Sequence, residues 1–217
     1  IDNRSSVLRN LENASSLIAR LCHRKFGVGA DGLILVNSSS TTDFEMTYYN
    51  ADGKIGSMCG NGGRCCVAFA NSLGLIKESA VFTAPDGLHE AIIVSKEKEQ
   101  TLVKLKMNDV DGVIRKENYF ILNTSSPHYV CYKKEVEKMN VFEEGRNIRY
   151  NKLFAKEGIN VNFAEVKENG VFVRTYERGV EDETLSCGTG ATAVAITASI
   201  ANFCEPNFCQ IIAPGGK

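Results

Sequence analysis

The 217-residue chain lacks features that would assign it at once to several large functional classes. Its formal net charge of -1 leaves no basic excess for binding nucleic acid or an anionic membrane surface. No apolar run approaches the roughly 20 residues that a membrane-spanning helix needs. No secretory signal peptide is recognisable at the start of the sequence. We therefore expect no nucleic-acid partner and no membrane association.

The eight cysteines also lack the spacings of the common cysteine motifs. They form no Cys-x-x-Cys pair and no paired zinc-knuckle pattern. A chain of this length with 43% hydrophobic residues does not need a disulfide framework, so a reduced, cytoplasmic setting is expected. Cys65 and Cys66 are predicted to be core residues. No dense cluster of His, Asp and Glu indicates a metal, and no lysine is marked for a Schiff base, so we expect neither metal nor cofactor.

One pattern occurs twice in the chain, over residues 58–70 and 186–198. Each copy reads Cys-Gly-polar-Gly and then continues in small and apolar residues. Glycines beside a cysteine suit a tight entry into a helix, and the runs that follow predict two helices that are buried on all sides. Cys59 and Cys187 would then lie at helix N-termini, where unpaired N–H groups favour a thiolate. Each cysteine alone could be a small core residue, but the repetition favours a shared function.

The order of elements around the two copies supports an internal duplication. Strands are predicted at 33–36, 44–49, 80–83, 90–95, 101–106, 119–122, 158–166 and 170–176. In each half a strand ends in polar residues, Asn50 or Glu177 and Arg178, and a cysteine follows nine or ten positions later (59 minus 50, 187 minus 177). The charged, turn-rich stretch 108–112 predicts a boundary between domains 1–110 and 111–217.

The N-terminal region adds a helix and a glycine-rich turn. Ser5 and Ser6 could cap a helix over residues 5–25, whose apolar face would comprise Leu8, Leu11, Leu17, Ile18 and Leu21. Residues 27–32 match the letters Gly-x-Gly-x-x-Gly of a dinucleotide-binding loop. The context is reversed, because a helix precedes the loop and a strand follows it. A turn is therefore the better interpretation.

Two thiols suit a stereoinversion if the two halves face each other. One thiolate would remove a proton from a carbon, and the other thiol would donate a proton to the opposite face. The N–H groups of Gly60, Asn61, Gly188 and Thr189 could stabilise the negative charge that develops on a carboxylate. This chemistry uses the same residue type twice because the reaction runs in both directions.

The same residues resemble the signatures of the diaminopimelate epimerases. The first signature is similar to residues 49–53 and 58–65, and the second to residues 176–179 and 186–191. Residues 26–32, Ser126-Pro127-His128 and Asn160 also fit. The resemblance implies an α/β (α+β) fold of two pseudo-symmetric lobes. Each lobe would be a mostly antiparallel sheet or barrel wrapped around a central buried helix.

The resemblance also implies an activity and a set of roles. The enzyme would be a cytoplasmic homodimer that converts LL- to meso-diaminopimelate without a cofactor, for lysine and peptidoglycan precursor synthesis. Cys59 and Cys187 would be the base and acid, with His128 and Glu177 tuning proton transfer. The predicted substrate-binding residues are Asn50, Gly60, Asn61, Ser126, Asn160, Glu177, Arg178, Gly188 and Thr189.

The chain departs from the family pattern in two respects. Ser126 occupies a position that is often Asn, which removes one donor from that contact. The family's Gly-Asn-Asp-Phe segment and its closing strands are absent, so we expect residues to be missing at both ends.

Several of these residues and the fold itself also have other interpretations. His128, after a proline in a predicted loop, could be structural, Glu177 and Arg178 could form an exposed ion pair, and Asn50 could be only a turn residue. The charged stretch 133–138 predicts a solvated face. The fold could also serve a racemase or isomerase of another small acid, or a redox sensor that closes a Cys59–Cys187 disulfide.

Overall fold

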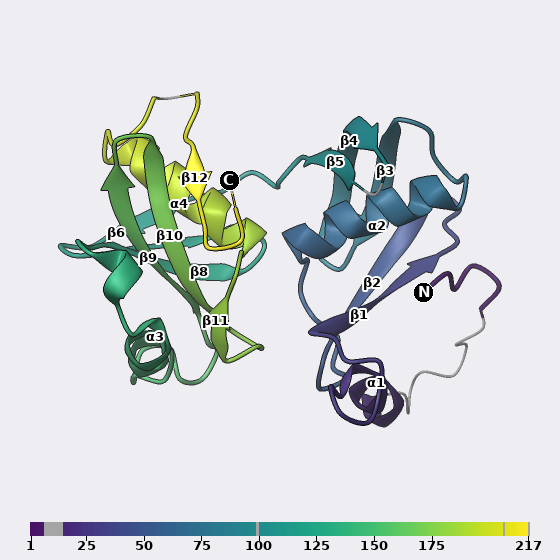
Figure 1. Cartoon of the computed structure of the whole chain (residues 1–217), viewed down its shortest axis with the longest axis horizontal. Coiled ribbons are helices and arrows are strands. Elements are labelled where there is room, and N and C mark those ends of the chain that lie inside the picture. Colours follow the sequence, from purple (N-terminus) through teal and green to yellow (C-terminus); the bar gives the residue numbers. More distant parts are fainter. Residues whose placement is uncertain (7–14, 99, 206, 217) are drawn as a thin grey trace. The chain divides into compact units, whose positions relative to one another are not determined.

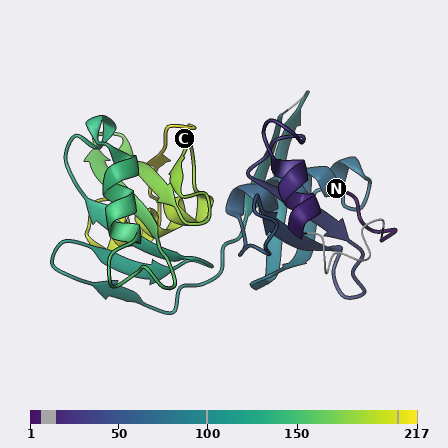
Figure 2. The same cartoon turned by 90° about the horizontal axis from the view of Figure 1, so that it is seen from below.

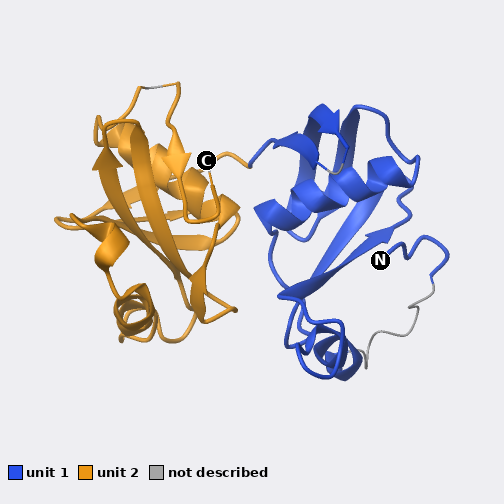
Figure 3. Cartoon of the chain, in the orientation of Figure 1, with its two compact units in different colours: residues 1–107 blue, residues 108–217 orange. Residues whose placement is uncertain are grey.

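The computed structural model describes residues 1–6, 15–98, 100–205 and 207–216. The chain divides into two compact units, residues 1–107 and 108–217 (Figure 3). The predicted boundary at 110/111 lies three residues beyond the structural one (110 minus 107). Both positions fall in the segment between the strand that ends at Leu105 and the strand that begins at Val113.

Unit 1 consists of one sheet with a helix on each face. Strand order is β1-β2-β3-β4-β5, and every neighbouring pair is antiparallel except β2 with β3. Helix α2 lies along one face of the sheet (Figure 1), and α1 packs on the other. The elements are α1 Ser15–Cys22, β1 Gly32–Asn37, β2 Phe44–Asn50, α2 Gly60–Ser72, β3 Ser79–Ala84, β4 Gly87–Glu97 and β5 Gln100–Leu105.

The alternation of side chains along β1 explains how one strand packs against both helices. Leu33 and Leu35 pack with the α1 residues Ile18 and Cys22. The adjacent Val36 belongs instead to the core beneath α2. Successive side chains of a strand point to opposite faces, so this short apolar run serves two cores.

Unit 2 repeats this plan with a larger sheet. Strand order is β11-β10-β9-β8-β7-β6, with β12 joined to β10. The β8–β9 and β10–β12 pairs are parallel and the others antiparallel. The elements are β6 Val113–Arg115, β7 Phe120–Asn123, β8 Pro127–Tyr132, η2 Val136–Lys138, α3 Val141–Arg149, β9 Asn160–Lys167, β10 Gly170–Glu177, β11 Asp182–Thr184, α4 Gly188–Ile200 and β12 Ile211–Ile212.

The two faces of this sheet carry different helices. Val161 and Phe163 of β9 share a core with Val141 of α3, which lies across the sheet (Figure 2). Ala164 of β9 belongs to the core that contains Ala193 of α4. The side chain of Asn162, two residues before Ala164, therefore lies on the α4 face of the sheet.

The predicted mixed fold of two similar, mostly antiparallel units is confirmed. In each unit a long strand, β2 or β10, precedes a helix of 13 residues, α2 or α4. Cys59 caps α2 with φ -108° and ψ 114°, and Cys187 caps α4 with φ -117° and ψ 111°. The two N-caps thus share one extended backbone conformation.

The prediction that both helices are buried on all sides is wrong. Each packs one face against its own sheet, and within unit 1 the other face of α2 leaves Cys65 exposed and Phe69 37% exposed. Cys65 is therefore not a core residue, whereas Cys66 is buried as predicted. The helix still ends before Gly74, whose φ of 71° suits a glycine after a helix C-terminus.

The predicted helix over residues 5–25 is also corrected. Ser6 has a φ of 56° and is not helical, while Leu8 and Leu11 lie outside the described residues. Helix α1 ends at Cys22, and the exposed Leu17 does not belong to its apolar face. The following glycine-rich segment forms turns that lead into β1, as predicted from its reversed context.

Candidate active site

In unit 1, Cys59 is held at the N-terminus of α2. Its Sγ accepts a hydrogen bond from the backbone N–H of Gly62 at 3.3 Å. A Cβ at Gly62 would lie 2.9 Å from Ile34 Cδ1 and 3.3 Å from Cys59 Cβ, so a larger residue would displace the Ile34 side chain. Gly60 and Asn61 belong to the first turn, whose N–H groups have no intrahelical acceptor. The geometry places the thiol beside the N–H of Gly62 at a helix N-terminus, a setting that favours a thiolate.

Two further predicted site residues of unit 1, Asn61 and Asn50, lie within ten positions of Cys59 in the sequence. The Asn61 side chain accepts a hydrogen bond from Arg64, one turn further along α2. Asn50 is the last residue of β2 and begins the predicted turn, since its carbonyl oxygen accepts the N–H of Gly53 at 2.9 Å. A Cβ at Gly56 would come within 3.0 Å of the Asn50 Oδ1. The backbone of Asn50 therefore opens a turn, while its side chain lies beside Gly56.

In unit 2, Cys187 has a different hydrogen-bond partner. The Cys187 Sγ lies 3.4 Å from the Oγ1 of Thr189. Thr189 Oγ1 also lies 3.0 Å from His128 Nε2. His128 is fully buried, and burial, followed by the nearby charge of Arg178, lowers its pKa to about 3. A neutral imidazole is thus linked to the Cys187 thiol through one hydroxyl group.

His128 does not lie in a loop as predicted. It is the second residue of strand β8, and it pairs in register with Asn160 of the parallel strand β9. Pro127 opens the strand, a position that proline tolerates because no ladder hydrogen bond from its nitrogen is needed there. The strand fixes the imidazole against the first turn of α4, which excludes a solvated role.

Ser126, Asn160 and Arg178 form a second cluster in unit 2. Asn160 Nδ2 donates to Ser126 Oγ at 2.8 Å and to the Pro127 carbonyl oxygen at 3.1 Å. Asn160 Oδ1 accepts the backbone N–H of Arg178 at 2.8 Å. The buried amide thus ties the segment before β8 to the end of β10. The hydrogen bonds of the Asn160 side chain therefore position the Arg178 backbone and the Ser126 side chain.

The Arg178 guanidinium is the available cation of this cluster. It donates to the Glu157 carbonyl oxygen at 3.0 Å, and among the described residues it forms no salt bridge with a carboxylate. Burial and the neighbouring Arg149 lower its pKa. Both effects weaken its charged form, and a bound carboxylate would offset them.

Glu177 and Arg178 are both partly buried, so they are not the exposed pair of the alternative interpretation. Glu177 is the last residue of β10, and its Oε2 accepts a hydrogen bond from Thr184 Oγ1 at 3.0 Å. Thr184 lies on the neighbouring strand β11. The carboxylate is therefore held at a strand end by the neighbouring strand.

Comparison with known proteins decides the family. The family model described as diaminopimelate epimerase matches residues 1–112 and 120–217. The chain belongs to the diaminopimelate epimerase family. It is 48% identical over 218 residues to the diaminopimelate epimerase of Flavobacterium psychrophilum, covering 100% of this chain and 83% of that protein. It is 36% identical over 238 residues to that of Aquifex aeolicus, covering 100% and 82%.

Solved structures support the same fold at lower sequence identity. A phenazine biosynthesis protein from Bacillus anthracis matches with a TM-score of 0.66 and 16% identity, over 95% of this chain and 74% of that one. A probable proline racemase from Agrobacterium radiobacter matches with a TM-score of 0.62 and 14% identity, over 89% and 67%. These two likenesses concern the fold alone.

The structure adds two residues that the sequence did not single out. Asn162 of β9 donates from Nδ2 to His128 Nδ1 at 3.0 Å, and its Oδ1 accepts from Thr175 Oγ1 at 2.9 Å. Asn162 and Thr175 are the two added residues, and both are buried on the α4 face of the sheet. The available signal was the alternation of asparagines at 160 and 162 with apolar residues, which marks a polar stripe on one face of a strand.

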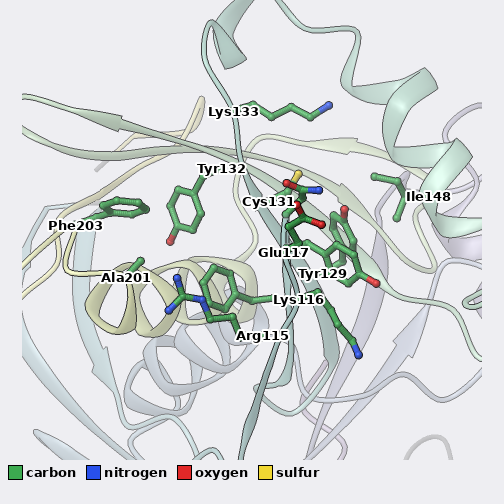
Figure 4. Close-up of a pocket in the computed structure, with 13 residues that line it drawn as sticks. Arg115, Lys116, Glu117, Tyr129, Cys131, Tyr132, Lys133, Ile148, Ala201 and Phe203 are labelled. Atoms are coloured by element: carbon green, nitrogen blue, oxygen red, sulfur yellow. The ribbon is translucent and has the colours of Figure 1, made fainter.

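A separate hollow in this family member contains none of the predicted site residues. It has a volume of about 490 Å³ in unit 2 and opens beside β6–β8 (Figure 4). Its walls include the Tyr129 ring, the exposed Arg115 and Phe203.

The helices of the described residues include none that is long and apolar enough to cross a membrane.

Proposed function

We propose that the protein epimerises LL-diaminopimelate to meso-diaminopimelate, with Cys59 and Cys187 as its base and acid. Membership of the diaminopimelate epimerase family supports the reaction and substrate. The single observation that carries the assignment of the cysteines is their identical place in the two units. Each caps the N-terminus of a 13-residue helix in the same extended conformation.

The proposed reaction is a proton exchange that leaves the oxidation state unchanged. The thiolate of one cysteine takes the α-proton, and the electron pair of the C–H bond delocalises into the substrate carboxylate. The thiol of the other cysteine then gives its proton to the opposite face of the same carbon. The amides of Gly60, Asn61, Gly188 and Thr189 would stabilise the charge on the carboxylate.

The remaining predicted residues would serve substrate recognition and proton transfer. Arg178 would bind the distal carboxylate with its planar fork, since its partly buried guanidinium carries no carboxylate partner among the described residues. Asn50 and Glu177, each at the end of a strand, would contact the distal ammonium group. Asn160, which would also hold the distal end, and Ser126 would complete the substrate-binding residues, and their side chains are hydrogen-bonded to each other. His128 and Glu177 would tune the thiols.

A decisive experiment follows the α-proton. The protein is incubated with LL-diaminopimelate in D₂O without added cofactor, and NMR and chiral chromatography measure deuterium incorporation and meso product. Cys59→Ala and Cys187→Ala should each abolish epimerisation. Cys65→Ala is the matched control, because Cys65 is an exposed thiol on the same helix as Cys59. Full turnover by either single alanine variant would exclude the two-thiol mechanism.

A second candidate function is racemisation or isomerisation of another small acid. The fold shared with a probable proline racemase favours it. Proline serves as the competing substrate in the same assay. Arg178→Ala should raise the KM for diaminopimelate, because only a substrate with a distal carboxylate needs this cation. An unchanged KM would remove the distal-end assignment and favour the alternative.

We further propose that the enzyme is a cytoplasmic homodimer that serves lysine and peptidoglycan precursor synthesis. Family membership supports this setting. Sedimentation velocity would test the dimer, and a single species with the mass of one 23.7 kDa chain at micromolar concentration would contradict it. Fractionation of the native host tests localisation, and growth of a deletion strain on supplied meso-diaminopimelate tests the pathway.

A further inference from the structure

The buried amide of Asn162 can take only one orientation. Its Nδ2 lies 2.9 Å from the Tyr129 carbonyl oxygen and 3.0 Å from His128 Nδ1, and its Oδ1 lies 2.9 Å from Thr175 Oγ1. A carbonyl oxygen can only accept, so the amide nitrogen must face Tyr129. The same nitrogen therefore donates its second proton to His128 Nδ1.

This orientation fixes the tautomer of His128. Because Nδ1 accepts a hydrogen bond, the proton of the neutral imidazole lies on Nε2. Burial lowers the pKa of His128 to about 3, so the ring stays neutral at physiological pH. The Nε2–H then donates to Thr189 Oγ1 at 3.0 Å.

The tautomer in turn directs the hydroxyl proton of Thr189. A hydroxyl group carries one proton, and its oxygen already accepts the Nε2–H of His128. The other neighbour of this oxygen is Cys187 Sγ at 3.4 Å. A Thr189 proton that points along this contact would stabilise a Cys187 thiolate.

We propose that Asn162 is a positioning residue that sets the proton direction of the chain Asn162–His128–Thr189–Cys187 and so favours the thiolate of Cys187. The inference rests on the proposed role of Cys187 as an acid–base group. It goes beyond that role because it names the residue that orients the donors. Gly190 belongs to the arrangement, since a Cβ there would lie 2.5 Å from Asn162 Oδ1 and 3.3 Å from Cys187 Sγ.

The first test reads the tautomer directly in the unmodified protein. Two-bond ¹H–¹⁵N spectra of histidine-labelled protein resolve three rings, His23, His89 and His128, and a His128→Gln sample assigns the third. We expect His128 to be neutral with its proton on Nε2 from pH 5 to pH 8. A proton on Nδ1, or a cationic ring at pH 7, would overturn the proposal.

The second test measures the Cys187 thiol through the pH dependence of its alkylation by iodoacetamide, followed by peptide mass spectrometry. Thr189→Val removes the donor, and the thiol pKa should rise by about one unit, which slows alkylation at neutral pH about tenfold. Thr189→Ser should restore the wild-type rate. Thr197→Val is the matched control, because it removes a buried hydroxyl group elsewhere on α4. Equal rates in wild type and Thr189→Val would refute the proposal.

The third test uses a substitution at Asn162 to reverse the direction of the hydrogen bonds in the chain Asn162–His128–Thr189–Cys187. In Asn162→Asp the new carboxylate accepts from His128 Nδ1, so the ring proton should move to Nδ1 and the Thr189 proton should turn towards Nε2. Alkylation of Cys187 should slow as in Thr189→Val. A folded Asn162→Asp protein with the wild-type tautomer and alkylation rate would contradict the inference. If the variant does not fold, the first two tests still decide.

These readouts are independent of epimerisation. A protein with the expected tautomer and thiol pKa but no exchange of the α-proton would reject the proposed function and leave the network standing. Normal epimerisation with the wrong tautomer would reject the inference about Asn162 alone.

Discussion

The neutral, buried His128 makes a specific prediction about acid stability. The imidazole has no exposed surface and its pKa falls from 6.5 to about 3, first through burial and then through the charge of Arg178. In the unfolded chain the same ring titrates near its ordinary value. Between these two pKa values the unfolded state binds more protons than the folded state. Stability from this group is therefore fully present above pH 6.5 and is lost as the pH falls towards 3.

The size of the effect follows from the difference in proton binding. The loss approaches about 1.4 kcal/mol per pH unit inside the window. Between pH 7 and pH 4.5 the His128 contribution should fall by about 2 to 3 kcal/mol. The free energy of unfolding of whole domains is typically about 5–15 kcal/mol, so a loss of about 2 to 3 kcal/mol should be measurable in the unfolding of unit 2.

The assay compares urea unfolding at the two pH values, followed by NMR signals of β9 and β10 amides, which report on unit 2. His128→Asn should be less stable than wild type at pH 7, because it loses buried hydrogen bonds, but it should lose about 2 to 3 kcal/mol less on acidification. Carboxylates that titrate in both proteins cancel in this comparison. His23→Gln, at an exposed position of unit 1, should behave like wild type. An equal acid-induced loss in wild type and His128→Asn would refute the reasoning.

Three further predictions concern packing and recognition. Gly190→Ala should lower the stability of unit 2 by about 1–3 kcal/mol in urea unfolding and reduce kcat for epimerisation, because the new Cβ meets Asn162 Oδ1 at 2.5 Å; an unchanged kcat would contradict the close approach. Arg178→Lys keeps the charge but loses the bidentate fork, so the KM for diaminopimelate should rise about tenfold with little change in kcat; an equal KM would exclude bidentate binding. Phe44→Ala should cost unit 1 about 3–5 kcal/mol in urea unfolding, since the ring is fully buried and stacks on Phe82 at 4.9 Å; a loss below about 1 kcal/mol would show that the core closes over the gap.

The sequence predicted the parts of the candidate site that depend on local patterns. A cysteine followed by glycine and a run of small residues indicates a helix entry, so the sequence predicts Cys59 and Cys187 at helix N-termini, and both are N-caps. The strands that end at Asn50 and Glu177 are predictable for a similar reason. Each is long enough for its sequence to show the residue pattern of a strand.

Short and non-local elements could not be predicted in the same way. Strands β6, β11 and β12 have only two or three residues, too few to show a period of two. Strand β8 begins at Pro127, after two serines, which is a sequence that indicates a loop. Its parallel partner β9 begins 33 residues later (160 minus 127), and no local pattern sets that register. His128 was therefore expected in a loop, although it is a buried strand residue.

Asn162 shows how a buried hydrogen-bond network can depend on strand pairing that the sequence does not reveal. Asn160 and Asn162 alternate with apolar Val161 and Phe163, a pattern that on its own indicates a solvent-facing stripe. Both amides are buried, because β8, β10 and the start of α4 bring their partners to that face. The helix entry is the same in both units, but the contacts of the two thiols differ. Cys59 Sγ accepts the backbone N–H of Gly62, whereas Cys187 Sγ lies 3.4 Å from the side-chain hydroxyl group of Thr189, so one backbone conformation places two cysteines beside different partners.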